Sequence, residues 1–441
     1  MTNDTLRVPM KLLLLLTPLA CLAADVDGWA KWRGPKDDGM ARGDAPAEWS
    51  DTKNIAWKTK IPGKGMSSPI IWGDRIFVTS AIAGEAPSKP AANDAQQGRR
   101  RGMSPGGDKG VDHKFMVYCV DRKTGKIIWE RLANTAAPHE GYHNRYGSYA
   151  SNTPATDGKM LYAFFGSFGL YAYDLDGKLA WKKSFAPMRM RMEFGEGVPL
   201  TLHADCLLVK LDSETNSYMV VFDKTTGKEL WRVDRGEPSS WSPPLVVTVK
   251  GKKQIVTSAS NKTRAYDYDS GKVVWECAGL GTNVIPAPVV LDDLIVVMSG
   301  HREPNLQAIR LGREGDLSGT DAVVWQNQRG NSYTPSPVLH DGKLYFITDS
   351  GQLSCFDMKT GKPYYHQQRL PKPYNFKASP VGANGKLYLS TEEGDVVVIK
   401  MGEKYEVLAT NTLDNASFIA TPAIVDGSIY LRSQDTLYAI R

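Results

Sequence analysis

One short segment carries residues whose spacing is that of a zinc enzyme. Residues 139–143 read His-Glu-Gly-Tyr-His, which matches H-E-x-x-H, the pattern that places two zinc ligands and a general base on one face of a helix. Pro138 precedes the segment, and Gly141 and Gly147 interrupt and follow it, so nothing nearby favours a helix. We therefore expect a polar loop rather than a zinc protease. A non-helical site that uses one of the two histidines stays open.

The elements that must position this loop form a repeat. Residues 117–130, 220–232, 264–276 and 354–366 each contain an apolar run, an Asp, a turn ending in Gly-Lys, a second apolar run and an aromatic residue eight positions after the Asp. A fifth copy, 170–182, has a spacing of seven. Asp can accept hydrogen bonds from its own downstream backbone, and Gly supplies the positive φ that a tight connection needs. The pattern predicts a hairpin whose aromatic side chain packs between neighbouring units rather than on a cofactor.

A second kind of hairpin precedes these units. Residues 67–81, 152–166, 335–349, 378–392 and 420–433 share a small residue followed by Pro, a short strand, a Gly-bearing turn and a strand rich in β-branched or aromatic residues. One repeat is therefore four strands, A to D, within roughly 40–50 residues, which is the size of a β-propeller blade.

Counting these repeats predicts eight blades. The eighth copy, 419–441, has strands A to C only, and residues 54–61, with Trp57, can supply its strand D. Such closure removes the unpaired edges of an open sheet array. We expect a single all-β domain over residues 25–441, an eight-bladed β-propeller of four-stranded antiparallel blades, with almost no helix. The seven complete copies are 67–130, 152–184, 197–234, 242–277, 286–328, 335–368 and 378–410.

The repeat also predicts a binding face. In an up-and-down blade, the B–C and D–A connections emerge on one side, which we call the loop face, and the A–B and C–D turns on the other, the turn face. The long irregular segments belong to the loop face, and residues 82–113 are expected to be a disordered insertion. Arginine and aromatic residues favour recognition, although a merely solvated loop face remains the alternative. The candidate residues are His139, His143, Arg145, Tyr149, Arg189, Arg191, Trp241, His301, Arg302, Arg329, Tyr333 and Tyr374.

Composition and the first residues indicate an exported protein. The 441 residues are 41% hydrophobic and 23% charged with a net charge of +6, which is ordinary for a globular protein and gives no sign of nucleic-acid binding. Residues 1–24 resemble a signal peptide, with two basic residues, a short apolar core and a small-residue end near Ala24. We expect a periplasmic or cell-envelope location, with a lipid anchor at Cys21 as the alternative, and no transmembrane span.

The remaining cysteines predict no disulfide framework. Cys119, Cys206, Cys277 and Cys355 contain no adjacent pair and no C-x-x-C. Most of them lie in strand-like runs, where a thiol behaves as a small apolar group.

The D-x-x-T-G-K-x-x-W unit, the segment 29–39 and the segment 148–181 resemble the PQQ-like β-propeller family of exported bacterial proteins, which includes quinoprotein alcohol dehydrogenase-like and BamB-like propellers. The resemblance implies the propeller fold. The enzymes of this family hold PQQ through a calcium ion with acidic ligands and an Asp base, and many have two adjacent cysteines over the cofactor. No residue here matches those positions, because the recurrent Asp residues lie in predicted turns on the turn face: 121, 174, 223, 267 and 357.

Three functions stay open. The first is a non-catalytic, monomeric scaffold that binds a protein or envelope partner through the loop face and requires no cofactor. The second is a PQQ-dependent oxidoreductase, with quinone and calcium near the central channel. The third is a hydrolase or a saccharide-binding propeller.

Overall fold

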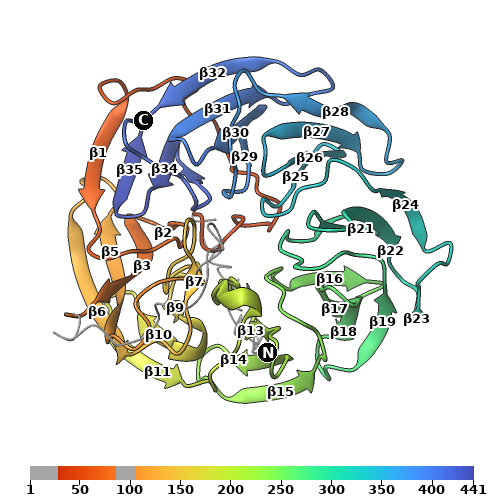
Figure 1. Cartoon of the computed structure of the whole chain (residues 1–441), viewed down its shortest axis with the longest axis horizontal. Helices are drawn as coiled ribbons and strands as arrows, with labels where there is room; N and C mark the ends of the chain where they lie inside the picture. Colours follow the sequence, from red (N-terminus) through yellow and green to blue (C-terminus); the bar gives the residue numbers. More distant parts are fainter. Residues whose placement is uncertain (1–27, 86–104) are drawn as a thin grey trace, which may run out of the picture.

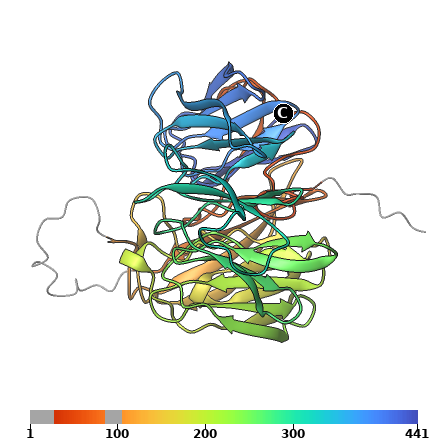
Figure 2. The ribbon, with the colours of Figure 1, turned by 90° about the vertical axis from the view of Figure 1, so that its right-hand side faces the viewer.

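Eight antiparallel sheets stand around a common axis in the computed structural model, which describes residues 28–85 and 105–441 (Figure 1). Each sheet is one blade, with strand A nearest the axis and strand D at the rim, and the ring is seen from its side in Figure 2. The predicted eight-bladed propeller is confirmed. Helix is limited, within the described residues, to the 3-10 turns η1 (Gly166–Phe168) and η2 (Arg191–Glu193).

The strands follow the chain blade by blade. Blades 1 to 4 consist of β2 (Ile70–Trp72), β3 (Arg75–Ala83), β5 (His113–Asp121) and β6 (Ile127–Ala136); β8 (Ala155–Thr156), β9 (Met160–Phe164), β10 (Leu170–Asp174) and β11 (Leu179–Lys183); β12 (Thr201–His203), β13 (Cys206–Leu211), β14 (Tyr218–Asp223) and β15 (Glu229–Asp234); and β16 (Leu245–Val249), β17 (Lys252–Thr257), β18 (Thr263–Asp267) and β19 (Val273–Cys277). Blades 5 to 8 consist of β20 (Val289–Leu291), β21 (Leu294–Ser299), β22 (Asn305–Arg310) and β24 (Val323–Asn327); β25 (Val338–His340), β26 (Lys343–Ile347), β27 (Gln352–Asp357) and β28 (Pro363–Arg369); β29 (Val381–Ala383), β30 (Lys386–Ser390), β31 (Asp395–Lys400) and β32 (Val407–Thr412); and β33 (Ala423–Val425), β34 (Ser428–Arg432), β35 (Thr436–Ile440) and β1 (Ile55–Lys60).

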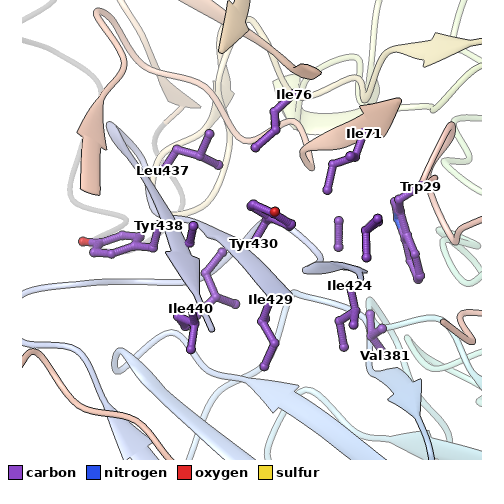
Figure 3. Packing of buried hydrophobic residues seen from close by; sticks show 14 of the residues in the cluster. Trp29, Ile71, Ile76, Val381, Ile424, Ile429, Tyr430, Leu437, Tyr438 and Ile440 are labelled. Carbon is purple, nitrogen blue, oxygen red and sulfur yellow. The ribbon is translucent and has the colours of Figure 1, made fainter. Parts of the chain in front are cut away.

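The two ends of the chain close the ring. Strand β1 pairs antiparallel with β35, from Ile55 opposite Ile440 to Lys60 opposite Thr436, as the sequence predicts. Figure 3 shows the core beneath this closure, where side chains of blade 8 meet Ile71 and Ile76 of blade 1 and Val381 of blade 7. Closure therefore rests on a sheet pairing and on a continuous buried core.

The C–D hairpins have the predicted turn chemistry. In blade 3, Oδ1 of Asp223 accepts hydrogen bonds from the backbone N–H of Thr226 at 2.7 Å and from its hydroxyl at 2.7 Å. Blade 1 repeats this arrangement with Asp121 and Thr124. These Asp side chains are therefore committed to turns on the turn face.

In five blades, the tryptophan of strand D joins its blade to the next one. The indole N–H of Trp57 donates to Arg122 O at 3.1 Å, that of Trp129 to Leu175 O at 3.0 Å and that of Trp181 to Lys224 O at 3.2 Å. Each acceptor belongs to the C–D turn of the following blade. Trp231 and Trp325 make the same contact, with Tyr268 O and Met358 O. The predicted packing between blades is confirmed.

Trp275 of blade 4 departs from this pattern. Its indole N–H donates to Gln254 Oε1 of its own blade at 3.2 Å. The connection that should accept it, 311–322 in blade 5, is long, and its strand β23 (Gly315–Asp316) pairs in parallel with Trp275 and Glu276 of β19. Strand β23 covers the indole, which is fully buried. Its N–H therefore bonds to a side chain of its own blade.

The segment that precedes β1 crosses the centre of the ring. Trp29 forms a bridge with Ile71 of blade 1, and Met40 with Gly382 of blade 7. Between them, the buried guanidinium of Arg33 donates to the carbonyl oxygens of Pro337 and Pro380. The Thr156 N–H of blade 2 also donates to Ala30 O, so residues 28–50 tie strands A of blades 1 and 2 to those of blades 6 and 7 at the turn-face end of the channel.

The segment 82–113, expected to be disordered, begins and ends in strand. Strand β3 continues to Ala83, β4 (Pro105–Gly106) pairs with β7 (Tyr142–His143), and β5 starts at His113. Residues 86–104 lie outside the described residues, as does the predicted signal peptide, 1–24. The four cysteines that follow it are free, and Cys206 alone among them is not fully buried.

Two glycines allow the free-energy cost of a left-handed backbone to be measured apart from the cost of a disturbed contact between blades. Gly227 and Gly342 both have a φ of +68°, but a Cβ at Gly227 would lie 2.8 Å from the Trp181 ring, whereas a Cβ at Gly342 would meet nothing within 4 Å. We expect Gly342→Ala to cost about 1–2 kcal/mol of unfolding free energy for its left-handed backbone. Gly227→Ala should cost a further ~1–3 kcal/mol, because Trp181 must move.

The measurement is urea unfolding followed by tryptophan fluorescence. Equal losses in the two variants would show that the Trp–Gly contact contributes nothing beyond the backbone conformation.

Candidate binding site on the loop face

The H-E-x-x-H segment is strand and turn, not helix. Tyr142 and His143 form β7, which pairs with Pro105 and Gly106 of β4. The His143 ring lies 3.5 Å from the Tyr146 ring, centroid to centroid, and nearly parallel to it. Both rings lie on the wall of a cavity near the axis of the ring. The two histidines therefore do not share one face of a helix, as the sequence predicts, although Tyr142 and His143 form a short strand where a loop was expected.

An aromatic cavity, called here the central cavity, opens near the axis on the loop face. Its volume is about 190 Å³, and D–A connections of several blades supply its wall. The largest side chains are those of His143, Tyr146, Phe194, Trp241 and Tyr333. Trp241 is 8% exposed, and its indole N–H donates to Gly195 O at 2.8 Å, so this wall is fixed by packing and by a hydrogen bond to a neighbouring connection.

A deeper cavity of about 160 Å³ shares Tyr146, Trp241 and other wall residues with the first. Trp32 of the segment that crosses the ring also lines it, and its indole N–H donates to Thr421 Oγ1 at 3.2 Å. Trp32 thus lies at the turn-face end of this cavity.

The structure brings part of the predicted face together. His143, Trp241 and Tyr333 line the central cavity. The His301 ring lies 5.0 Å from the Tyr333 ring, which places Arg302 at the same edge. Arg189 and Arg191 come from the connection that also supplies Phe194 and Gly195 of the wall.

The remaining predicted residues have other surroundings. Tyr374 is 3% exposed, and its hydroxyl donates to Asp395 Oδ2 at 2.9 Å, so it is a packing residue between blades 6 and 7. Arg329 is exposed just after strand D of blade 5 and does not line the cavity. His139 and Tyr149 line a separate small cavity next to the main one.

Lys377 and Tyr146 are site residues that the sequence analysis missed. The Lys377 ammonium lies 4.6 Å above the Tyr146 ring and forms ion pairs with Asp349 at 2.6 Å and with Glu392 at 3.8 Å. Arg145 is also paired with Glu392, at 3.2 Å, although the Arg145 side chain is 67% exposed. The sequence signal was present in "YNFK" and "NRYG", where a basic residue lies next to aromatic residues in a D–A connection.

Charge and burial keep the cavity wall neutral at His143. Burial, together with the positive charges of Lys377 and Arg145, lowers the pKa of the His143 imidazole to about 4. Burial also raises the pKa of Tyr146 and Tyr333. The wall is therefore aromatic and uncharged near neutral pH, with basic side chains around it.

The small neighbouring cavity contains two carboxyl groups. Glu140 and Glu196 lie beside His139, and one ligand atom of each residue lies within 4.8 Å of the others. Burial raises the pKa of Glu196 to about 8 and that of Glu140 to about 7, and the proximity of each carboxylate to other acidic groups adds to the effect.

Comparison with protein families gives one match that extends over nearly the whole chain. The model of outer membrane protein assembly factor BamB matches residues 41–198, 113–367 and 215–441, in overlapping copies that reflect the repeat. The chain belongs to the BamB family. No curated protein sequence matches this BamB-family chain.

Solved structures with the same fold include both kinds of propeller that the sequence resembles. BamB from Moraxella catarrhalis is 13% identical with a TM-score of 0.52, covering 74% of this chain and 94% of that one. Quinohemoprotein alcohol dehydrogenase from Comamonas testosteroni is 12% identical with a TM-score of 0.63, covering 94% and 80%. A europium-containing methanol dehydrogenase is 12% identical with a TM-score of 0.62, covering 92% and 89%. At these identities, the similarity establishes the fold of the BamB-family chain and not its activity.

The donor set of the central cavity does not fit PQQ bound through calcium. Calcium prefers oxygen ligands, chiefly carboxylates, and none of the described residues that line the two central cavities is Asp or Glu. The recurrent Asp side chains are engaged in turns on the turn face, as Asp121 and Asp223 show. Free Cys119, Cys277 and Cys355 are buried within blades. The walls thus lack the groups that would hold that cofactor.

The depressed pKa of His143 predicts a pH dependence of stability. The unfolded chain takes up a proton on this histidine near pH 6.5, whereas the folded chain does so near pH 4. Unfolded molecules therefore bind more protons in this window, and the fold loses stability as the pH falls from about 6.5 toward 4. His143→Gln should remove this contribution.

The measurement compares urea unfolding of both proteins at pH 7.5 and pH 5. The loss between the two pH values should be smaller in the variant, and an equal loss would contradict the assignment. The values at pH 7.5 serve as the control, because the imidazole is neutral there in both states.

Proposed function

We propose that this BamB-family propeller is a non-catalytic scaffold of the cell envelope that binds an acidic segment of a partner protein on its loop face. The observation that carries the proposal is an aromatic cavity with two arginines beside it, Arg191 and Arg302, that form no ion pair with any residue in the described part of the chain. The family match supports it, since the family is described by a protein of outer-membrane assembly.

The cavity offers what an anchoring side chain requires. Aromatic residues and arginine dominate the energetic centres of protein interfaces, where a partner side chain fills a desolvated pocket. His143, Trp241 and Tyr333 provide such a wall, and hydrogen bonds to neighbouring connections hold it in place before a partner arrives. A preformed wall reduces the entropy lost on binding.

The charges at the edge of the cavity specify the partner. Arg189, Arg191 and Arg302 form no ion pair with a residue that the structure describes, and Arg189 and Arg302 are exposed. Burial, and after it the positive charges of Arg302 and Arg191, lowers the pKa of His301, so the fields of both arginines reach the ring beside Tyr333. An acidic segment with one apolar side chain complements this arrangement, with the charges steering association and the apolar group filling the cavity.

Location and assembly complete the proposal. The predicted signal peptide supports export, and no helix among the described residues is long and apolar enough to cross a bilayer. We propose a periplasmic or envelope-associated monomer that presents its loop face to the partner.

The test uses a charge reversal with a matched control. The double variant Arg191→Glu/Arg302→Glu changes the loop face, and Lys126→Glu/Lys228→Glu makes the same change in net charge on exposed turn-face hairpins. The probe is an array of acidic peptides that carry one Phe, with counterparts that carry Ala in its place. We expect the loop-face variant to lose at least tenfold in affinity and the control variant to bind like the original protein.

Three outcomes would overturn the proposal. They are equal binding by both variants, binding that is insensitive to the Phe, and binding that does not weaken at higher salt, where exposed charges are screened.

A separate titration addresses the quinone alternative. Because the walls of the central cavities offer no carboxylate among the described residues, adding PQQ and Ca²⁺ to the protein should give only the sum of the two absorbance spectra. A saturating spectral change at one quinone per chain would instead favour the oxidoreductase.

A further inference from the structure

We propose that His139, Glu140 and Glu196 form a divalent-cation site, called here the cation pocket, next to the central cavity. The three residues come from two consecutive D–A connections, one between blades 1 and 2 and one between blades 2 and 3. The inference concerns metal binding by the isolated chain and does not depend on the proposed partner.

The spacing of the three side chains suits one ion. One ligand atom from each residue lies within 4.8 Å of the other two. Ligands bound at about 2.0–2.6 Å from a common ion are at most roughly 4–5 Å apart, so small side-chain adjustments can bring all three onto one cation.

A cavity of the right size lies between them. Its volume is about 10 Å³, and its wall includes His139, Glu140 and Glu196 together with Ser148 and Tyr149. That volume is about the space of one water molecule, which leaves room for a single ion or water and no larger ligand.

Charge balance gives an independent reason for a cation. The Glu140 residue is 8% exposed and the Glu196 side chain 10%. Glu196 accepts hydrogen bonds from the Ser167 backbone N–H and, at 2.8 Å, from its hydroxyl, and Glu140 accepts from the Met190 N–H at 3.0 Å. None of these donors carries a charge, and no described Lys or Arg forms an ion pair with either carboxylate. Two neighbouring carboxylates buried in this way are neutralised by protons, and a divalent cation that displaces those protons would satisfy the same charge balance.

The orientation of His139 supports coordination. Its Nε2 lies 2.7 Å from Met188 O, an atom that can only accept, so Nε2 carries the proton and Nδ1 keeps its lone pair. A backbone carbonyl that fixes one ring nitrogen while the other binds metal is the usual outer-shell arrangement of metal-binding histidines. The protonated Nε2 is also the nitrogen that lies 3.7 Å from Glu196 Oε1, so coordination uses either Nδ1 or an Nε2 that has given up its proton and its contact with Met188 O.

The donor set indicates the metal. One imidazole and two carboxylates suit first-row divalent ions such as Zn²⁺ or Mn²⁺, because imidazole is a poor ligand for Ca²⁺ and Mg²⁺. The pocket uses the first two residues of the H-E-x-x-H match, and Glu196 of a distant connection takes the place of His143, which lines the central cavity instead.

The test is calorimetric titration of chelator-treated protein with ZnCl₂, MnCl₂ and CaCl₂ in turn. We expect one Zn²⁺ or Mn²⁺ per chain, at least tenfold tighter than Ca²⁺. Glu196→Gln and His139→Gln should each weaken binding at least tenfold, and the matched variant His143→Gln should bind like the original protein. Circular dichroism of the metal-free variants controls for folding.

A second readout uses Co²⁺. A visible absorption band on loading Co²⁺, absent in Glu196→Gln and retained in His143→Gln, reports direct coordination. The proposal is overturned by absence of stoichiometric binding, or by binding that survives both Glu196→Gln and His139→Gln. Failure here leaves the acidic-peptide array unaffected, because that array tests the arginines at the central cavity.

Discussion

The pairing of β1 with β35 is the interaction on which the rest of the molecule depends. It places Trp57 against blade 1, where its indole N–H donates to Arg122 O as that of Trp129 does to Leu175 O of the next blade. Without this pairing, blade 8 would end at β35 and two sheet edges would be unpaired. A closed ring also fixes the distances between all the D–A connections, which is why irregular loops can form a defined cavity.

Most of the fold could be predicted because its signals repeat. The Asp, the Gly and the aromatic residue recur at nearly constant offsets, and each has a local cause that the structure confirms, such as the Asp223 turn. The sequence analysis did not foresee the second role of the glycine, which lies under the tryptophan of the preceding blade, as Gly227 lies under Trp181. That contact joins residues of different repeats, and no single repeat contains it. The exception at Trp275 likewise depends on the inserted β23 of the next blade.

The candidate site could be predicted only as a face. The repeat determines on which side each connection emerges, so the loop face followed from strand order. The loop conformations do not repeat, so the sequence does not show which side chains meet on this face. Tyr374, for example, was assigned to the surface, although its hydrogen bond to Asp395 holds it inside. Lys377 and Glu196 were missed for the same reason, since their partners, Asp349 and Ser167, lie on other connections. The H-E-x-x-H match could be rejected from the sequence, because this pattern indicates a zinc site only on a helix and Pro138 and Gly141 do not favour one.

The central cavity and the cation pocket are adjacent because they use the same two connections. Gly195 lines both, Phe194 lines the first and Glu196 the second, so the chain passes from one cavity to the other within three residues. The same connection carries Arg191, whose charge acts on His301, and Arg189, whose charge acts on Glu140. Just before these residues, the backbone has a φ of +51° at Met192 and +53° at Glu193, and such a conformation persists only where the surroundings hold it. The hydrogen bonds from Met190 N to Glu140 and from Arg191 N to Ser239 Oγ supply that support. A cation between Glu140 and Glu196 would therefore affect the residues that shape the binding face. The effect would pass along the backbone of the connection that they share, and not through contacts across the propeller.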